Sequence, residues 1–168
     1  MGNSGDKGKV GNLNYDSKCT ELLGTNNRET LSFDDSDFVR DKFNFRIAEV
    51  RIWHDNYYVY GIQTIYEMDG TQKTPGSHLG NGASKKKNIQ IQKLVLHPEE
   101  YIVAIDIRSG TWIDAITIRT NLRRTLTAGG SGGSLTTFQL SSGYHFTSFA
   151  GGNSEYLDTL QANFTKIE

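Results

Sequence analysis

The chain has 168 residues, of which 36% are hydrophobic, and its 18 lysines and arginines against 19 acidic residues give a formal net charge of -1. This length fits one domain that can bury a core without a disulfide or metal, and the single cysteine, Cys19, excludes an internal disulfide. The near-neutral charge argues against nucleic acid as a partner, and no apolar run is long enough to span a membrane.

The first twenty residues are polar and contain no apolar stretch like the core of a signal peptide. We expect residues 1–20 to form a flexible tail and residues 21–168 to form the folded domain. The lack of a secretion signal in this chain slightly favours a cytoplasmic location, although the sequence does not determine where the protein resides.

Beyond the tail, apolar residues alternate with polar ones in short bursts instead of recurring at helical spacing, which predicts β-strands. Turn signals rich in glycine separate these bursts, since the chain holds 18 glycines and only 2 prolines. In chain order the bursts are Val50 to Ile52, Ile62 to Tyr66, Ile89 to Leu96, Val103 to Ile107, Ile116 to Thr120, Phe138 to Leu140 and Leu160 to Phe164. The sequence therefore predicts an all-β sandwich, barrel or prism.

One pattern of aromatic, aliphatic, variable, small and aliphatic residues recurs three times. It reads "YVYGIQTI" at 58–65, "WIDAITIR" at 112–119 and "YLDTLQAN" at 156–163. Three copies of one supersecondary unit predict three sheets related by a pseudo-threefold axis.

Each copy begins in a polar turn, and the turns differ in chemistry. The first reads "NYYVY" at 56–60, the second "GTWID" at 110–114 and the third "SEYLD" at 154–158. Aspartate and glycine disfavour strand interiors, so they belong to the turn that leads into each strand.

With these features the chain resembles the jacalin-related lectins. The resemblance rests on "HPEEYIVAIDIRSGTWIDAITIRTN" (97–121), on the glycine loops "HLGNG" (78–82) and "GGSGG" (129–133), and on "YLDTLQANF" (156–164). It covers residues 21–168 and implies a β-prism I fold, built of three four-stranded Greek-key sheets with pseudo-threefold symmetry. It also implies a non-enzymatic lectin that binds mannose- or glucose-type glycans without a metal or other cofactor.

In this family a sugar lies where a G-x-x-x-D loop meets a glycine-rich loop at the same end of the prism. An ionised carboxylate suits this task because it only accepts hydrogen bonds and can take them from two sugar hydroxyls. Glycines let backbone amides approach the ligand closely, and an aromatic ring can pack against the apolar face of a pyranose.

Carried over position by position, the resemblance implies one main site and one second candidate site. The main carbohydrate site comprises Gly110, Thr111, Trp112, Ile113, Asp114, Gly129 and Gly130. The second comprises Ser154, Glu155, Tyr156 and Asp158, with "LGTNNR" (23–28) as its partner loop. The second site departs from the pattern because Ser154 replaces glycine, and the first turn has lost the acceptor because Tyr60 replaces aspartate.

The residues suggest neither catalysis nor metal binding. Neighbouring acidic pairs such as Glu99 and Glu100 are too close in sequence to identify the two carboxylates of a glycosidase. Ser131 lacks a nucleophile elbow and a placed histidine, and no set of His, Cys and carboxylates has metal-ligand spacing. Glycans or glycoproteins are therefore the expected partners, and the chain could act as a homo-oligomer or as part of a larger protein.

Alternatives remain open at this point. Asp114 and Asp158 could simply stabilise turns through their own hydrogen bonds, and "GGSGG" could be a flexible linker. Trp112 could be a half-buried aromatic at a strand end, and the run from Lys85 to Lys87 could be a solvated surface or bind polyanions. The alternative function is that of a β-prism interaction or targeting domain of a larger protein, with degenerate sugar sites.

Overall fold

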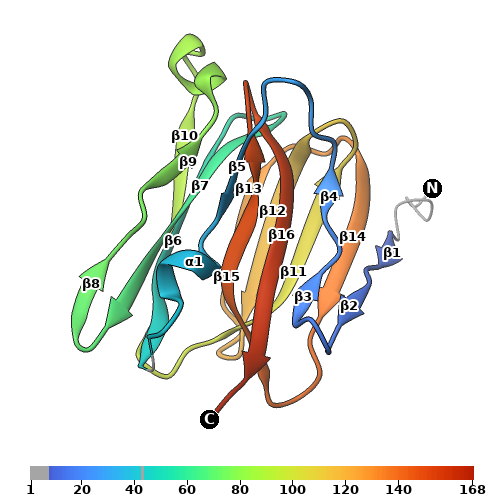
Figure 1. The fold of residues 1–168 in the computed structure, drawn as a ribbon. Helices are drawn as coiled ribbons and strands as arrows, with labels where there is room; N and C mark the ends of the chain where they lie inside the picture. Colours follow the sequence, from blue (N-terminus) through green and yellow to red (C-terminus); the bar gives the residue numbers. More distant parts are fainter. Residues whose placement is uncertain (1–7, 43) are drawn as a thin grey trace.

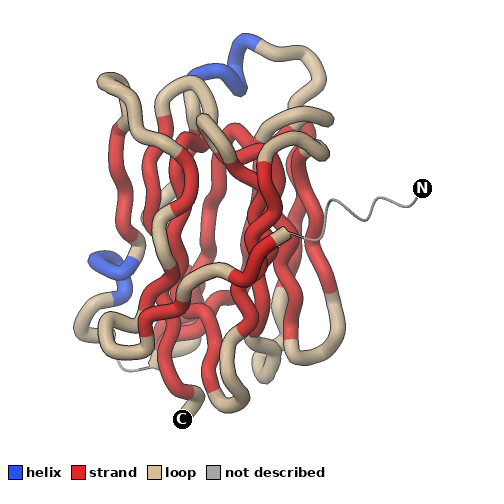
Figure 2. The backbone as a smooth tube through the Cα atoms, turned by 90° about the vertical axis from the view of Figure 1, so that its right-hand side faces the viewer, coloured by secondary structure: helices blue, strands red, loops and turns tan. Residues whose placement is uncertain are grey.

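The computed structural model describes residues 8–42 and 44–168, and these are nearly all in strands and turns (Figure 1). The strands run along the long axis of the molecule, and loops cover both ends (Figure 2). Two short helical turns are α1 (Ser36–Val39) and the 3-10 helix η2 (Asn81–Lys85). In the described ranges no helix is long and apolar enough to cross a membrane.

The first sheet is built on a long antiparallel hairpin, β6 with β7, in which Phe45 pairs with Met68 at the open end. Its strand order is β10-β6-β7, with β8 and β9 both pairing with the outer side of β7. The bounds are β6 (Phe45–His54), β7 (Val59–Met68), β8 (Thr71–Lys73), β9 (Ser77–Leu79) and β10 (Gln90–Val95).

The second and third sheets repeat this plan. In the second the order is β14-β11-β12-β13, and in the third β5-β15-β16 followed by β4 and β3. One pair, Ile102 with Phe146, joins the two sheets through the inner strands β11 and β15. The bounds are β11 (Ile102–Ser109), β12 (Ile113–Thr120), β13 (Thr125–Gly129), β14 (Ser134–Gln139), β15 (Tyr144–Asn153), β16 (Leu157–Lys166), β3 (Cys19–Thr20), β4 (Leu23–Gly24) and β5 (Leu31–Asp34). The all-β prism of three sheets predicted from the sequence is confirmed.

The pseudo-threefold symmetry extends to the irregularities of the strands. Each central hairpin has a register shift just before its turn, at Trp53/His54, Arg108/Ser109 and Gly152/Asn153. A β-bulge increases the local twist and redirects the chain, so the equivalent bulges aim the three turns in the same way. All three turns therefore lie at one end of the prism.

The inward faces of the three sheets share one hydrophobic core. Its fully buried side chains include Ile52, Ile62, Ile105, Ile116, Phe146, Phe149 and Leu160. Burying one such side chain contributes about 1.5–3 kcal/mol, so these residues provide the main stabilisation of the fold.

The N-terminal segment differs from the expected tail. Residues 1–7 lie outside the described residues, but β1 (Lys9–Val10) pairs in parallel with β14 and β3 pairs with β16. The hairpin partner of β3 is β2 (Leu13–Asn14). Strands of two residues are too short to show an alternating pattern, so they could not be predicted from the sequence. The segment is held to the sheets by Gly11, which donates to the Thr137 carbonyl, and by Tyr15, whose ring packs edge-on against Tyr144.

The contact at Gly11 provides a test of this attachment. A β-carbon on Gly11 would lie 2.2 Å from the Phe138 ring, so Gly11→Ala should overpack the contact and lower stability by about 1–3 kcal/mol. Thermal unfolding should show a Tm reduced by roughly 2–4 °C per kcal/mol for a domain of this size. Gly110→Ala is the control, since nothing lies within 4 Å of a β-carbon there. Equal Tm values for the two variants would contradict the attachment.

Candidate functional site

The three hairpin turns meet around a cluster of aromatic side chains at one end of the prism. Tyr58, Trp112 and Tyr156 occupy equivalent positions in the three repeats. The ring centroids of Trp112 and Tyr156 are 4.6 Å apart, and Tyr58 lies 5.0 Å from Tyr156 and edge-on to Trp112 at 5.5 Å. All three side chains are half-buried. This cluster marks the pseudo-threefold axis and fixes the three turns relative to one another.

Each glycine-rich loop bridges the turn of its own sheet and the turn of a neighbouring sheet. Gly130 donates to the Asp114 carbonyl at 2.9 Å and lies against the backbone of Asn56 and Tyr57. In the same way, Gly82 donates to the carbonyl of Glu155 from the third turn. The loop at 23–28 packs on Asp158 through Gly24, and Thr25 donates to the carbonyl of Gly110 at 3.4 Å. The end of the prism thus presents three related turn-and-loop pairs, which differ in the chemistry of their side chains.

The second turn holds a carboxylate that receives no hydrogen bond within the described part of the chain. Asp114 is 7% exposed, and nothing in residues 8–42 and 44–168 donates a hydrogen bond to its side chain. The carboxylate lies beneath the glycine loop, because β-carbons built on Gly132 and Gly133 would be 3.0 and 2.7 Å from Asp114 Oδ2. Only glycines leave room for this arrangement, so the loop sequence and the carboxylate are matched.

Burial and charge act in opposite directions on this carboxyl group. Burial raises the pKa of Asp114 above its usual value, and the positive charge of Arg108 opposes this shift without cancelling it. The carboxylate oxygens are not among the fully buried polar atoms that lack a partner in the described residues, so they remain open to solvent and to a ligand. The carboxylate of Asp114 is therefore suited to accept hydrogen bonds from hydroxyl groups of a ligand.

The two glycines predicted to contact the sugar have a different structural role. Gly129, with φ at 105°, donates to His54 Nδ1 at 3.1 Å, and Gly130 donates to the Asp114 carbonyl, so both amides are occupied. The amides of Ser131 and Gly132 make no hydrogen bond with the described part of the chain and remain as donors for a ligand. The sequence placed the loop next to Asp114 but could not tell which of its amides point away from the protein.

The other predicted residues of the main site are exposed to different degrees. Thr111 and Gly110 are exposed, whereas the side chain of Ile113 is completely buried in the core and can offer only its backbone. Trp112 belongs to the axial aromatic cluster, and its ring packs against Tyr156. Trp112 is therefore half-buried at the start of β12, as one interpretation of the sequence predicted, and it also belongs to the second turn, where the main site was predicted.

Sequence reasoning missed two residues that contact the glycine loop from the first sheet. Tyr57 is 69% exposed, and its backbone lies against Gly130. His54 is buried at 6% exposure and accepts the Gly129 amide. Both contacts cross from one sheet to the next, so no local pattern could reveal them, although two adjacent tyrosines in a polar turn were a signal for an exposed aromatic residue.

In the third turn the equivalent carboxylate already has partners. Asp158 is 1% exposed and its Oδ2 accepts from Thr30 Oγ1 at 2.7 Å and from Asn27 Nδ2 at 3.5 Å. The Asn27 amide also donates to Ser154 Oγ at 3.1 Å. Thr30 and Asn27 therefore donate to the carboxylate oxygen that would otherwise accept from the hydroxyl groups of a ligand.

A cleft of about 540 Å³ lies beside this third turn. Ser154 and Glu155 line it together with Asn27, Arg28 and Lys85. Tyr156 is instead part of the axial cluster. The structure thus brings together the residues of the second candidate site, but its acidic acceptor is engaged within the protein.

The first turn has no acceptor equivalent to Asp114, in keeping with its sequence. Tyr60 occupies that position and donates through its hydroxyl to Asp55 Oδ2 at 2.8 Å. Burial alone would raise the pKa of Asp55, but hydrogen bonds from the Tyr58 and Tyr57 amides and from Tyr60 outweigh it and lower the pKa. Asp55 is therefore a turn-stabilising residue.

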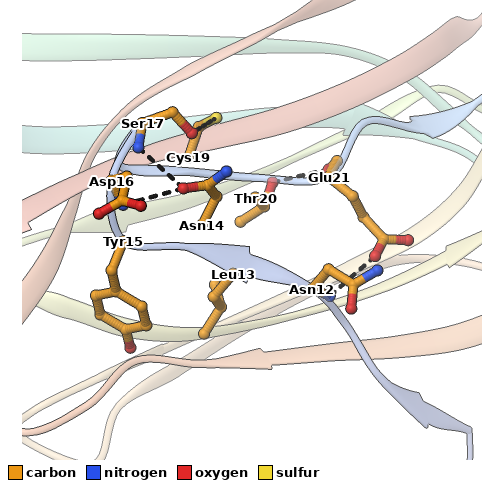
Figure 3. A pocket seen from close by; sticks show the side chains of 9 residues that line it. All are labelled: Asn12, Leu13, Asn14, Tyr15, Asp16, Ser17, Cys19, Thr20 and Glu21. Atoms are coloured by element: carbon orange, nitrogen blue, oxygen red, sulfur yellow. Dashed lines mark hydrogen bonds between the residues drawn. The ribbon is translucent and has the colours of Figure 1, made fainter.

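A cleft of about 550 Å³ elsewhere lies on the β2–β3 hairpin (Figure 3). Its polar groups mostly bind one another, as Asn14 Oδ1 accepts from the Asp16 and Ser17 amides and Glu21 accepts from Asn12. These bonds cap the hairpin turn. In the described parts of the chain, no cluster of His, Cys, Asp and Glu could hold a metal ion.

Comparison with known proteins agrees with this architecture. The family model of the jacalin-like lectin domain matches residues 21–163, and the chain belongs to this family. The family consists of carbohydrate-binding proteins that are not enzymes, as the sequence led us to expect. No curated protein sequence matches the chain.

Similar solved structures include single-chain recombinant jacalin, with a TM-score of 0.72, 18% identity and coverage of 88% of this chain and 93% of jacalin. A mannose-specific jacalin-related lectin from Morus nigra, solved in complex with mannose, has a TM-score of 0.71 and 19% identity over 88% of this chain and 93% of its own. Malaysian banana lectin has a TM-score of 0.71 and 17% identity, covering 89% and 98%. At these identities the likeness establishes the fold.

Asp114 and Asp158 should respond differently to the same substitution. Asp158→Ala removes an acceptor from Thr30 and Asn27 and should lower the free energy of unfolding by about 1–3 kcal/mol. Asp114→Ala removes a carboxylate to which no described residue donates, and its raised pKa means that the charged form is disfavoured in the fold, so stability at pH 7 should not fall comparably. Urea unfolding of both variants measures the difference, and an equal loss would contradict these assignments.

Proposed function

We propose that the chain binds mannose- or glucose-type glycans at a single main site, formed by the second turn, 110–114, and the glycine loop 129–133. The observation that carries this proposal is the largely buried carboxylate of Asp114, which lies beneath a loop of glycines and receives no hydrogen bond from residues 8–42 and 44–168. Membership of the jacalin-like lectin family supports carbohydrate as the ligand class.

In the proposed complex, Asp114 accepts hydrogen bonds from two neighbouring sugar hydroxyls. Charge-assisted bonds of this kind are about twice as strong as neutral ones. The amides of Ser131 and Gly132 donate to sugar oxygens, and the absence of β-carbons on the glycines allows a pyranose to come close. Tyr57, exposed beside Gly130, provides an apolar surface for the C–H face of the ring.

The sugar class is proposed by analogy with similar structures. The Morus nigra lectin is described as mannose-specific, and a lectin from Champedak with a TM-score of 0.70 and 18% identity is described as mannose-binding. These descriptions apply to those proteins, and their common fold makes mannose and its relatives the first ligands to test here.

One site of this kind should bind weakly. A few polar contacts to a well-hydrated ligand leave little net free energy, and about -4 kcal/mol corresponds to a millimolar dissociation constant. We propose that useful affinity depends on multivalency, through a homo-oligomer or additional domains of a larger protein. The internal contacts of Asp158 favour a single sugar per chain over two.

Those same internal contacts support the alternative function, that of an interaction or targeting domain. In two of the three turns the residue equivalent to Asp114 is engaged within the protein, since Asp158 accepts from Thr30 and Tyr60 donates to Asp55. A domain that had lost sugar binding altogether would bind a protein partner through the same end of the prism, and the binding measurements below separate the two functions.

Removal of the Asp114 carboxylate should abolish sugar binding. Loss of a hydrogen bond to a charged group costs about 1.5–3 kcal/mol, so Asp114→Ala should weaken binding of mannosides at least tenfold. A glycan array followed by calorimetry with methyl α-mannoside tests this, with methyl β-galactoside as the sugar control. Asp158→Ala is the matched variant and should retain binding wherever it remains folded. Loss only in Asp158→Ala would mean that the third turn is the site.

Tyr57 should contribute to affinity but not to stability. Its side chain is largely exposed, so Tyr57→Ala should leave the Tm nearly unchanged. Loss of ring packing against the sugar should weaken binding by about 0.5–1.5 kcal/mol, or roughly two- to tenfold. Tyr57→Phe keeps the ring and should bind like the wild type. Unchanged affinity in Tyr57→Ala would remove this residue from the site.

A further inference from the structure

We propose that the outer face of the second sheet holds a separate anion-binding site, which takes the phosphate or sulfate group of a small organic monoester. The site is a hollow of about 300 Å³, and its lining includes Arg119, Arg123 and Arg124. It lies where β12 ends, whereas the 110–114 turn lies where β12 begins. The hollow shares no residue with the proposed sugar site, so neither proposal depends on the other.

The hollow lies over a row of side chains that crosses the second sheet. Directly paired residues of antiparallel strands point to the same face, and Ile105 and Ile118, the next pair along, are buried in the core. The row therefore points outward, and its members in β14, β11, β12 and β13 are Gln139, Ala104, Arg119 and Thr125. Ala104 is the smallest of them, and Val103 adds a second apolar side chain to the lining.

Two of the three arginines are held in place by carboxylates. Nη1 and Nη2 of Arg119 donate to the two oxygens of Asp106 at 2.5 and 2.8 Å. Nη1 of Arg124 donates to Glu100 at 2.7 Å and to the Val95 carbonyl at 3.0 Å. A guanidinium group has five N–H donors, so both arginines keep donors for a ligand. Because their side chains are already fixed, a ligand does not have to immobilise them.

Arg123 occupies a backbone position that usually belongs to glycine. Its amide donates to the Thr120 carbonyl at 3.0 Å, and the Thr120 amide donates to the Arg124 carbonyl at 3.0 Å, so residues 121–123 form a three-residue hairpin loop. The last residue of such a loop adopts the left-handed conformation, in which glycine is favoured. Arg123 has φ at 64°, and strained residues of this kind are concentrated at functional sites.

The side chain of Arg123 is exposed and makes no hydrogen bond or ion pair with residues 8–42 and 44–168. The charges of Arg119 and Arg124 are balanced by Asp106 and Glu100. Arg123 therefore gives the rim its net positive charge, and none of the described residues that line the hollow is acidic. A rim of this kind attracts an anion.

The number of arginines favours a tetrahedral oxyanion. A phosphate or sulfate monoester presents three terminal oxygens, whereas a carboxylate presents two, and the guanidinium group is well suited to bind such oxygens. A hollow of about 300 Å³ is as large as a small ligand pocket, and Val103 and Ala104 offer contact to an apolar group. The ligand that fits best is therefore an oxyanion esterified to a small organic body.

Arg123→Gly separates the ligand role of this side chain from its effect on the fold. Glycine is favoured at a φ of 64°, so the variant should be at least as stable as the wild type although it loses the guanidinium group. Lys18→Gly is the matched control, since Lys18 is exposed, has φ at 59° in the β2–β3 turn and lies outside the hollow. A clear loss of Tm in Arg123→Gly alone would mean that the side chain supports the fold, and would overturn the inference.

Binding is measured by adding phenyl phosphate or phenyl sulfate to the labelled full chain at low salt, with the backbone amide and arginine Nε resonances as readout. We expect shifts at 103–104, 119–125 and 139. Affinity should fall at least about tenfold in Arg123→Gly, whereas Lys18→Gly should bind like the wild type. Added salt should weaken binding, because it screens exposed charges. No shifts at millimolar phenyl phosphate, or equal affinity in Arg123→Gly, would overturn the site.

Three further probes test the class of ligand. Benzyl alcohol lacks the charge and should not bind, while benzoate and inorganic phosphate should each bind more weakly than phenyl phosphate. Benzoate that binds as tightly would overturn the preference for a tetrahedral oxyanion, and inorganic phosphate that binds as tightly would overturn the organic ester. Methyl α-mannoside should leave these resonances unmoved, so failure of the sugar site and failure of the anion site are told apart.

Discussion

Three long antiparallel hairpins bury their inner faces in one shared core, and this burial determines where everything else in the molecule lies. Side chains such as Ile52, Ile116 and Leu160 each belong to a different sheet and are completely buried together. Because the hairpins carry equivalent bulges before their turns, packing them around one axis brings the three turns to the same end. The gathering of the three turns at one end of the prism is thus a consequence of core packing and strand register.

The three turns show how one backbone arrangement can carry different chemistry. In the second, the carboxylate of Asp114 is largely buried and no described residue donates to it, whereas in the third Asp158 accepts from Thr30 inside the protein. In the first, Tyr60 replaces the acid and is itself a donor, to Asp55. Repetition of the fold supplies three equivalent positions, and in only one of them does the described structure leave an acidic side chain without an internal partner.

The sequence was informative wherever the signal was local. Alternating apolar residues predicted the strands, and the spacing of Gly110 and Asp114 predicted the turn, because both depend on neighbours along the chain. The two-residue strands near Gly11 were missed, since they are too short to alternate. His54 and Tyr57 were missed because they reach the glycine loop from another sheet. The occupied amides of the loop depend on hydrogen bonds across the prism, which no pattern in one sequence can reveal.

The central claim is that a sugar lies between the second turn and its glycine loop. The most direct test is to follow the backbone amide resonances of the labelled protein while methyl α-mannoside is added. The account predicts shifts that concentrate in residues 110–114 and 129–133, with smaller changes at Tyr57. Shifts that concentrate at 154–158 and 23–30, or no shifts at millimolar sugar with the domain folded, would contradict it.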